Sequence, residues 1–380
     1  MHLTSKLPNV GITIFTKMSK MATEFGAINL SQGFPDFPVD PQLIDRVHHY
    51  MKQGLNQYAP MPGVPQLREA IANKTEICYG WMPNVDTNIT VTCGAIEAIM
   101  SAISALIHPG DEVIILDPAY DAYEPIIKLQ GARAVGVPLR SEDYSIDWKL
   151  VWEAISDRTK MIIINSPHNP SGAILTAEDL EALEDIVDET GLMVLSDEVY
   201  EHIVFDGAEH QSVLRSEKLR ANSVVVSSFG KTFHATGWRM GYLVAPETLM
   251  TEIRKVHQYN TFTIHTPTQF AVADYLKDSS HYLGVSDMYQ QKRDYFLDAM
   301  KDSKFQPVHS SGTYFQLMNY SAISAKGDVE FADWLTQEVG VAAIPMSVFY
   351  QDGQDNKVLR FCFAKGEDTL RAAADKLNEL

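Results

Sequence analysis

Short apolar runs alternate with amphipathic stretches through the middle of the chain. Seven runs between about Asn88 and Ala245 are continuous and apolar, which is typical of strands buried on both faces. These runs read NITVT, DEVIILD, ARAVGVPL, TKMIIIN, LMVLSD, SVVVSSF and GYLVA. Stretches with apolar residues three and four positions apart, such as GAIEAIMSAISALIHPGD and AEDLEALEDIVDETG, separate most of them and predict helices. The alternation predicts an α/β fold with a mainly parallel, seven-stranded sheet between helices.

The spacing of strands and helices changes after roughly Ser280. A long amphipathic helix, SDMYQQKRDYFLDAMKD, leads into a strand, GTYFQLMNY. A helix DVEFADWLTQEVG, the strands VAAIPM and VLRFCFA, and a last helix EDTLRAAADKLNEL complete the chain. We therefore expect a second, smaller α+β domain. The predicted division is an N-terminal arm with part of the small domain in residues 1–40, a large domain in 41–280 and a small domain in 281–380.

Composition narrows the classes of protein that this chain can represent. Its 380 residues are enough for two domains, and a hydrophobic content of 45% is enough for a sizeable core. A formal net charge of -18 argues against nucleic acid or an anionic membrane as a partner. Three separated cysteines without a CxxC pair, no apolar leader and no apolar stretch of membrane-span length predict a cytoplasmic protein.

Several common sites are disfavoured because their motifs are missing. Gly230-Lys231-Thr232 resembles the end of a phosphate-binding P-loop, but Val225 stands where that motif needs glycine, which argues against a P-loop kinase. The chain has no Gly-x-Gly-x-x-Gly run for a nicotinamide or flavin cofactor, and no Gly-x-Ser-x-Gly run. The 12 histidines include no HExxH, so no metal site is expected.

Candidate chemistry lies at the strand ends, because ligands of open α/β sheets bind beyond the carboxyl ends of the strands. Five of the predicted strands are followed by a distinctive side chain or by the start of a helix. These are a helix N-terminus at Gly94, Ala95 and Ile96, an aromatic ring at Tyr120, an amide at Asn169, an acid and a phenol at Asp197 and Tyr200, and an amine at Lys231. Each has a structural explanation by itself; Asp197, for instance, is typical of a helix cap.

The set as a whole matches pyridoxal 5′-phosphate (PLP). This cofactor needs a lysine amine for its Schiff base and an acid that keeps its ring nitrogen protonated. It also needs donors for its phenolate oxygen, a ring to stack on, and a phosphate cradle such as a helix N-terminus. Arg239, eight residues after Lys231, adds a positive charge for the phosphate. Burying a charged lysine is costly unless it is paired, which favours a functional role for Lys231.

Several motifs resemble those of the fold-type I, class I and II PLP-dependent aminotransferases. They are SSFGKTFHATGWRMGY, SPHNPSG, SDEVYE, INLSQGFPDFP, NQYAPMPGVPQLREAI and VLRFCFA. The similarity runs from roughly Leu7 to the C-terminus, and within the family it is strongest to bacterial methionine aminotransferases and to kynurenine and glutamine transaminases. The resemblance implies the fold of that family and PLP as the cofactor.

The resemblance also implies roles for the residues of the cofactor site. Lys231 would bind the cofactor covalently and then move the proton at the substrate α-carbon. Asp197 would pair with the ring nitrogen, and Tyr120 would stack on the ring. Asn169 and Tyr200 would hydrogen-bond the phenolate oxygen. The phosphate would be held by Gly94, Ala95, Ile96, Ser228 and Arg239, with Tyr58 reaching it from the neighbouring subunit of a homodimer that shares its active sites.

For the substrate, the resemblance implies that Arg360 clamps the α-carboxylate in a bidentate fork. Gly33 would lie behind that carboxylate and Asn169 beside it, and Phe15 would wall the side-chain pocket. From the residues alone, a structural ion pair stays open for Arg360, and a plain core position stays open for Phe15.

The implied activity is amino-group transfer from an amino acid to a 2-oxo acid by a ping-pong mechanism. β-Elimination of the cysteine-conjugate type and kynurenine-type transamination stay open as alternatives, whereas a PLP-bound regulator is disfavoured because no DNA-binding module fits before Gly33. Aspartate aminotransferases of this family bring a second arginine from the loop that here reads QYNTFTIHTPTQ, residues 258–269, which has no arginine or lysine. We therefore expect an uncharged substrate such as methionine, glutamine or an aromatic amino acid.

Overall fold

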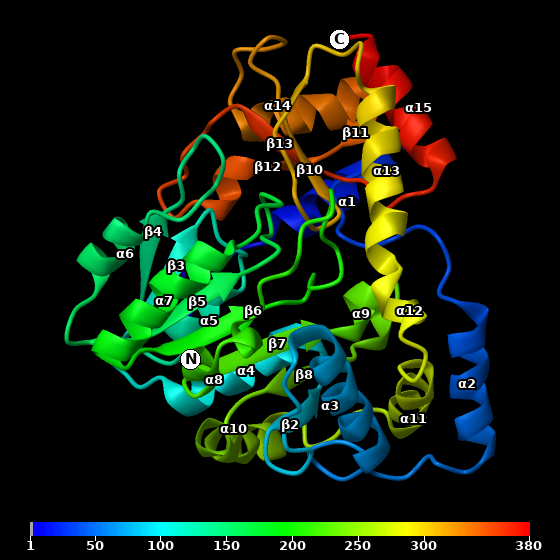
Figure 1. The fold of residues 1–380 in the computed structure, drawn as a ribbon. Helices are drawn as coiled ribbons and strands as arrows, with labels where there is room; N and C mark the ends of the chain where they lie inside the picture. The colour runs from blue at the N-terminus through cyan, green and yellow to red at the C-terminus, as the bar shows by residue number, and fades with distance from the viewer. Residues whose placement is uncertain (1–2) are drawn as a thin grey trace.

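A seven-stranded sheet forms the centre of the larger part of the molecule in the computed structural model, which describes residues 3–380 (Figure 1). The strand order is β2-β8-β7-β6-β5-β3-β4, and β8 alone is antiparallel to its neighbours. The strands are β2 (Ile89–Thr92), β3 (Glu112–Asp117), β4 (Arg133–Pro138), β5 (Thr159–Asn165), β6 (Met193–Asp197), β7 (Ser223–Ser228) and β8 (Gly241–Val244). β3, β7 and β8 are buried at every residue, as a doubly covered sheet requires. The predicted mainly parallel sheet is confirmed.

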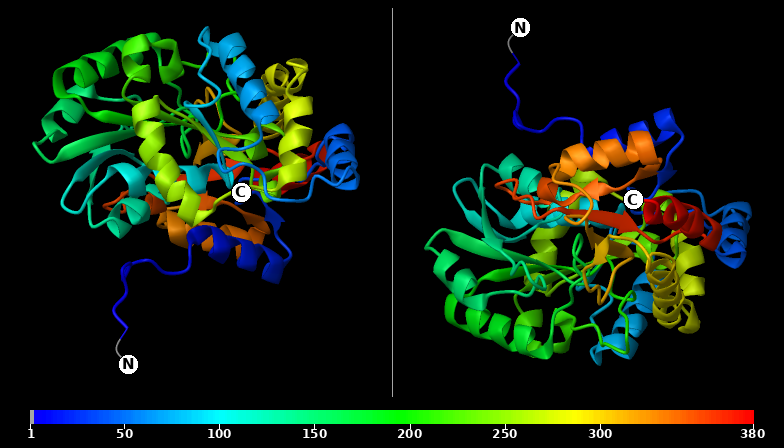
Figure 2. Two further views of the ribbon diagram at one scale, coloured as in Figure 1. Left: turned by 90° about the horizontal axis from the view of Figure 1, so that it is seen from below. Right: turned by 90° about the horizontal axis from the view of Figure 1, so that it is seen from above.

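Helices cover both faces of this sheet. α4 (Gly94–Leu106) lies against β7, β8 and α10 (Glu247–Asn260) on one face, and α7 (Ala177–Thr190) covers the other (Figure 2). Local sequence signals fix the ends of α7: Thr176 and Asp179 form a capping box at its start, and Gly191 ends it in the left-handed conformation. The other helices of this part are α2 (Pro41–Lys52), α3 (Pro65–Tyr79), α5 (Tyr123–Leu129), α6 (Trp148–Ala154), α8 (Glu217–Arg220), α9 (Phe229–Thr232) and α11 (Thr266–Tyr275).

The smaller part of the molecule is built on a four-stranded antiparallel sheet in the order β12-β13-β10-β9. Its strands are β9 (Gln306–Pro307), β10 (Phe315–Asn319), β12 (Ile344–Pro345) and β13 (Val358–Cys362). The long α13 (Val285–Ala299) follows α12 (Ser280–Leu283) and packs against α15 (Glu367–Asn378) beside this sheet (Figure 1). Short 3-10 helices lie at Val213–Arg215, Thr236–Trp238 and Met346–Phe349.

One stretch predicted as a single helix, DVEFADWLTQEVG, is interrupted. α14 (Asp328–Trp334) passes into a π-helical turn at Leu335–Val339, which Gly340 ends in the left-handed conformation. The Thr336 hydroxyl donates to Ala332 O at 2.8 Å. A threonine that bonds back to a carbonyl one turn earlier competes with the main-chain bonds of the helix, and this disturbs its regular pattern.

The start of the chain joins the smaller part of the molecule. Thr13 caps the start of α1 (Ile14–Phe25) because its hydroxyl accepts the Thr16 N–H, and Gly26 ends the helix in the left-handed conformation. β1 (Ile28–Asn29) then pairs in parallel with β11 (Val341–Ala342). Segments from opposite ends of the sequence therefore lie side by side, while the first described residues project from the body (Figure 2).

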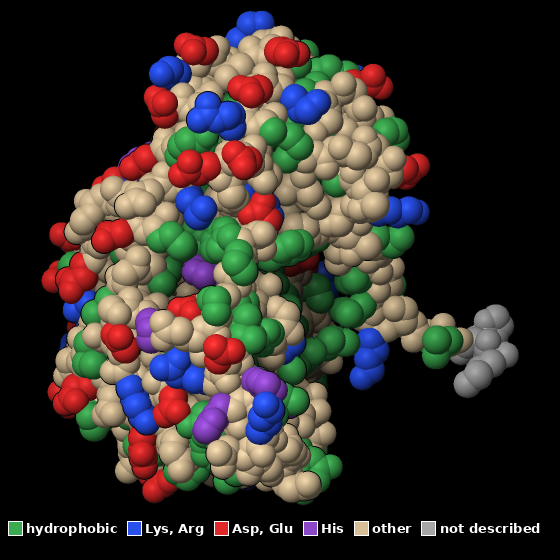
Figure 3. All heavy atoms as spheres, turned by 90° about the vertical axis from the view of Figure 1, so that its right-hand side faces the viewer, with side chains coloured by type: hydrophobic (Ala, Val, Ile, Leu, Met, Phe, Trp, Pro, Cys, Tyr) green, Lys and Arg blue, Asp and Glu red, His purple; other side chains and the backbone are tan. Residues whose placement is uncertain are grey.

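The surface follows the acidic composition. Figure 3 shows acidic side chains spread over one face, with basic side chains between them. No helix within residues 3–380 is long and apolar enough to cross a membrane. In the same range, no group of three or more His, Cys, Asp or Glu side chains is arranged to hold a metal ion.

Candidate active site

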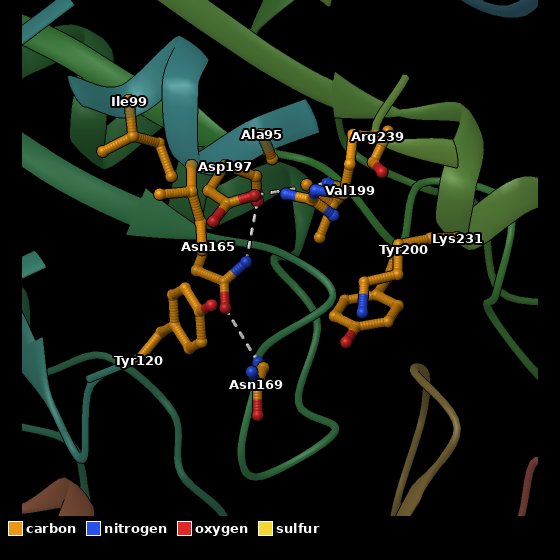
Figure 4. Close-up of a pocket in the computed structure, with 12 residues that line it drawn as sticks. Ala95, Ile99, Tyr120, Asn165, Asn169, Asp197, Val199, Tyr200, Lys231 and Arg239 are labelled. Carbon is orange, nitrogen blue, oxygen red and sulfur yellow. Dashed lines mark hydrogen bonds between the residues drawn. The ribbon is translucent and has the colours of Figure 1, made fainter. Parts of the chain in front are cut away.

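A cavity lies where the carboxyl ends of β5, β6 and β7 face the start of α4 (Figure 4). Ile99, Asn165 and Val199 form part of its lining. The remaining lining residues were all predicted from the sequence: Ala95, Ile96, Tyr120, Asn169, Asp197, Tyr200, Ser228, Lys231 and Arg239. The structure thus gathers side chains from distant segments at the edge of the sheet where ligands bind.

Asp197 is the last residue of β6 and is buried. Its Oδ2 accepts the Tyr123 hydroxyl at 2.6 Å, and its main-chain oxygen accepts Asn165 Nδ2 at 2.8 Å. Burial raises the pKa of the Asp197 carboxyl to about 6, and the hydrogen bond from Tyr123 opposes that rise. A carboxylate fixed in one orientation beside a cavity can pair with a protonated ring nitrogen.

Asn169 and Tyr200 lie on the loops that follow β5 and β6. The Asn169 N–H donates to Asn165 Oδ1 at 2.8 Å, which ties its loop to the end of β5 (Figure 4). The Tyr200 ring lies edge-on to the Tyr314 ring, with the centroids 5.1 Å apart. Burial raises the pKa of the Tyr200 phenol, so its hydroxyl stays protonated and can donate to an anionic oxygen.

Lys231 lies on α9, the short helix that follows β7. Its Nζ donates to Tyr314 Oη at 2.9 Å and to Gly33 O at 3.4 Å. Burial lowers the pKa of the Lys231 amine to about 8, and the charges of Arg360 and Arg239 add to this effect. An amine with a lowered pKa is more often neutral near physiological pH, as attack on a carbonyl carbon requires.

A cradle for an anion forms where α4 begins beside Arg239. The first N–H groups of a helix have no partner within the helix, and in the described part of the chain no side chain caps this one. Gly94 adopts φ 70°, and a Cβ at this position would lie 2.6 Å from Arg239 Nη2, so only glycine admits the guanidinium so closely. A Cβ on Gly241 would lie 2.9 Å from Ser227 O and from the Gly94 carbonyl carbon. The buried Ser228 ends β7 beside this cradle.

Arg360 is buried on β13, in the smaller sheet. Its Nη1 donates to Asn169 Oδ1 at 2.6 Å and its Nη2 to Ser31 O at 3.4 Å. Among the described residues its Nε has no hydrogen-bond partner. Because no carboxylate of the chain pairs with it, the ion-pair explanation fails within residues 3–380. A buried guanidinium with a free donor is suited to an incoming carboxylate.

Gly33 and Phe15 both contribute to the setting of Arg360. A Cβ at Gly33 would lie 2.8 Å from Phe315 Cζ, and the Phe315 ring centroid lies 3.8 Å from the Arg360 guanidinium carbon. The Phe15 ring lies 5.3 Å from the same carbon and packs on Phe349 at 6.1 Å. Phe15 is thus a neighbour of the arginine and does not line the cavity described above.

Tyr58 lies outside the cavity of its own chain. The residue is 83% exposed, and its ring meets that of Phe262 edge-on with the centroids 5.4 Å apart. A groove on the same surface is lined by Asn56, Gln57, Tyr58 and residues 263–267. The segment before α3 and the loop after α10 therefore lie together on the outside of the molecule.

Tyr123, Asn165 and Tyr314 belong to the site but were not predicted. Asn165 ends β5, so the strand-end argument that selected Asp197 would have found it. Tyr123 meets the Tyr120 ring edge-on at 5.6 Å, besides its bond to Asp197. Neither that bond nor the contact of Tyr314 with Lys231 has a local sequence signal, because both depend on which segments become neighbours in the fold.

The residues of the cavity fit PLP. The uncapped start of α4 and Arg239 suit its phosphate, the buried Asp197 carboxylate suits its ring nitrogen, and the Lys231 amine suits its aldehyde. The free Nε of Arg360 is left for a carboxylate on a substrate.

Comparisons with known proteins agree with this geometry. The family Aminotransferase class I and II matches residues 26–377. Methionine aminotransferase of Escherichia coli (strain K12) is 52% identical over 377 residues, which are 99% of this chain and 98% of that protein. Kynurenine–oxoglutarate transaminase of Dictyostelium discoideum is 34% identical over 97% of this chain and 94% of that protein.

A solved structure gives the same result for the whole fold. The crystal structure of YbdL from Escherichia coli, which identified a methionine aminotransferase function, matches with a TM-score of 0.98 at 51% identity and covers 100% of both chains. Class I and II aminotransferases use PLP, in agreement with the cofactor predicted from the sequence. The chain belongs to the class I and II aminotransferases.

Proposed function

We propose that this aminotransferase takes the amino group from an uncharged amino acid, methionine foremost, and passes it to a 2-oxo acid. The observation that carries this proposal is the 52% identity with Escherichia coli methionine aminotransferase over 99% of the chain. The likeness to kynurenine–oxoglutarate transaminase supports aromatic substrates beside methionine.

The cavity suggests a division of labour around the cofactor. When bound, PLP supplies an aldehyde carbon for amine exchange and a ring that withdraws electrons. Lys231 would hold it covalently, and Asp197 would keep its ring nitrogen protonated. Asn169 and Tyr200 would donate to its phenolate oxygen, and Tyr120 would stack on its ring. Its phosphate would be held by Gly94, Ala95, Ile96, Ser228 and Arg239.

The chain's own groups then act on the substrate. Arg360 would take the α-carboxylate through Nε and Nη2, while Asn169 fixes Nη1 from the other side. That carboxylate would lie against the Gly33 loop. The Lys231 amine would move the proton between the substrate α-carbon and the cofactor. To take up that proton, the amine must be in its neutral form.

Substrate choice gives the first testable prediction. We expect kcat/KM for methionine to exceed that for aspartate by about 100-fold or more, because a buried carboxylate without a partner is strongly unfavourable. The segment at residues 258–269 spans the end of α10, the loop after it and the start of α11. It contains no arginine or lysine and offers Tyr259, Phe262, Ile264 and His265 instead. The measurement compares methionine, glutamine, phenylalanine, kynurenine and aspartate with one shared 2-oxo acid acceptor.

An aspartate rate equal to the methionine rate would refute this pocket. His265 would then be the suspected source of the missing positive charge. A parallel assay without any acceptor acid separates transamination from β-elimination. Sustained release of pyruvate and ammonia from a sulfur-containing amino acid would assign the enzyme to the second class.

We also propose a homodimer with shared active sites. The exposed Tyr58 packs against the half-buried Phe262 on the outside of the molecule, and this arrangement supports a second copy docking there. Tyr58 would then reach the phosphate in the site of the neighbouring copy, and the segment at residues 258–269 would contribute to the side-chain pocket of that site.

Subunit exchange tests the shared site. Mixing Tyr58→Ala with Lys231→Ala should restore up to about a quarter of the wild-type activity, because half of the dimers become mixed and each mixed dimer has one intact site of two. Mixing Asp197→Ala with Lys231→Ala is the matched control, since both residues serve the same chain's site and every mixed site stays defective. Full activity in a strictly monomeric preparation would contradict the proposal.

The compartment and the domain division are proposals of the same kind. Cys78, Cys93 and Cys362 are all free thiols, and this supports a reducing compartment such as the cytoplasm. The pairing of β1 with β11 supports assigning part of residues 1–40 to the small domain.

A further inference from the structure

A chain of hydrogen bonds links the Lys231 amine to the smaller part of the molecule. Lys231 Nζ donates to Tyr314 Oη at 2.9 Å, and Tyr314 Oη donates to Gly33 O at 2.6 Å. Tyr314 is fully buried and immediately precedes β10, whereas Lys231 follows β7. The phenol therefore joins the two sheets at the lysine nitrogen.

Tyr314 is held firmly in place by its surroundings. Its main-chain oxygen accepts the Phe363 N–H at 3.0 Å, and the preceding Thr313 N–H donates to Ile203 O at 2.9 Å. Its ring meets the Tyr200 ring edge-on, at 5.1 Å and 87°. A phenol oxygen anchored through both its ring and its main chain can define the position of whatever bonds to it.

The direction of the two bonds is also fixed. A phenol has one proton, and here that proton goes to Gly33 O, so the Tyr314 lone pairs face Lys231. Burial raises the pKa of the Tyr314 phenol well above its ordinary range, which keeps that proton on the oxygen. Tyr314 therefore accepts from the amine and cannot itself act as an anionic base.

We propose that Tyr314 is a positioning residue for Lys231, an inference that rests on the catalytic role proposed for that lysine. Whenever the amine is not covalently attached to the cofactor, Tyr314 Oη accepts one of its N–H groups. The nitrogen is thereby held beside Gly33, which lies on the loop against which the substrate carboxylate would bind. This orientation prepares the amine for proton transfer at the α-carbon.

The bond has a second consequence for the charge of the amine. An acceptor bonds more strongly to an ammonium than to a neutral amine. Tyr314 therefore favours the charged form of Lys231 and opposes the lowering of the pKa that burial produces. Removing the acceptor should lower the pKa of the Lys231 amine further.

Tyr314→Phe tests the proposal because it removes only the hydroxyl and keeps the ring. Tyr289→Phe is the matched control: the Tyr289 ring lies 5.5 Å from that of Tyr314, but its hydroxyl bonds to His234 Nδ1 at 3.0 Å and not to the lysine.

The first measurement uses the apoenzyme. Covalent attachment of PLP, followed by absorbance, requires the neutral amine, so its rate plotted against pH has its midpoint at the pKa of Lys231. We expect this midpoint to fall by about one unit in Tyr314→Phe and to stay unchanged in Tyr289→Phe.

The second measurement uses the holoenzyme with methionine deuterated at the α-carbon. We expect kcat of Tyr314→Phe to fall about 10-fold to 100-fold, with KM nearly unchanged and a larger deuterium isotope effect, because a badly placed amine slows the proton transfer itself. Incorporation of 3-fluorotyrosine at position 314 weakens the acceptor without removing it. This variant should shift the midpoint in the same direction by less, and it covers the case in which Tyr314→Phe does not fold.

The proposal is overturned if neither 314 variant moves the midpoint or the isotope effect, or if Tyr289→Phe moves them equally. Failure of the underlying function has a different signature, since wild-type protein would then not attach PLP at Lys231 at all.

Discussion

Lys231→Ala is expected to lower kcat by about 10⁴-fold while the protein still binds PLP. The substitution removes the amine that would hold the cofactor covalently and move the substrate proton. It leaves the start of α4, Arg239 and the Asp197 carboxylate, which do not depend on the lysine. Single-turnover absorbance measurements with methionine would give the rate, and equilibrium dialysis would give the affinity for PLP.

Two controls make this result specific. Lys128→Ala changes an exposed lysine of α5 whose only ion pair among the described residues is with Glu124, one turn away, and it should retain wild-type rates. Borohydride reduction of the wild-type holoenzyme, followed by peptide mapping, should place the pyridoxyl group on the peptide that contains Lys231. A label on another lysine, or a Lys231→Ala enzyme within tenfold of wild type, would refute the assignment.

Asp197→Asn is expected to lower kcat by about 10²-fold to 10³-fold and, at neutral pH, to make the apoprotein more stable. The amide has nearly the shape of the carboxyl but carries no charge to keep a ring nitrogen protonated. The gain in stability follows from the folded-state pKa of about 6, which lies above the ordinary value of 3.8 because the carboxyl is buried. Ionising the group therefore opposes folding.

The sign of this effect fixes its pH window. A carboxyl whose pKa is raised on folding reduces stability as the pH rises from about 4 to about 6, and the reduction persists above that range. Asp197→Asn removes it, so the free energy of unfolding of the apoprotein at pH 7.5 should rise by up to about 3 kcal/mol. Denaturant titrations at pH 4 and pH 7.5 check this, because the difference between variant and wild type should shrink at the lower pH. A variant less stable than wild type at pH 7.5 would contradict the burial argument.

The mainly parallel sheet was predictable because most of its strands are buried on both faces, although the edge strand β4 is largely not. Such strands read as continuous apolar runs, and the residue after each run is then a candidate for the site. Asp197, Asn169 and Lys231 were found in this way, and the cavity gathers all three. These residues could be found because local sequence shows where each strand ends, and ligands bind beyond the carboxyl ends of the strands.

Contacts between segments that are distant in sequence could not be predicted in the same way. The bond from Tyr123 to Asp197 and the bond from Lys231 to Tyr314 arise from packing, as does the distance of 3.8 Å between the Arg360 guanidinium and the Phe315 ring. The role of Tyr58 depends on a second copy of the chain, and the boundaries at residues 40 and 280 stay predictions. The π-helical turn after α14 could not be predicted either, because the spacing of apolar residues in that stretch is that of a regular helix.

The pairing of Ile28 with Val341 limits the order in which parts of the fold can form during synthesis. Every strand of the large sheet has been synthesised once Val244 has been added, so that sheet can form while the rest of the chain is still being translated. β1 must wait for β11, which at about 5–20 residues per second is a delay of roughly tens of seconds. During that interval α1 and the Gly33 loop have no final place, and Arg360 has not yet been added. The growing chain can therefore form the strand ends of its cofactor pocket first. It acquires Arg360, the residue proposed to bind the substrate carboxylate, only with the last part of the chain.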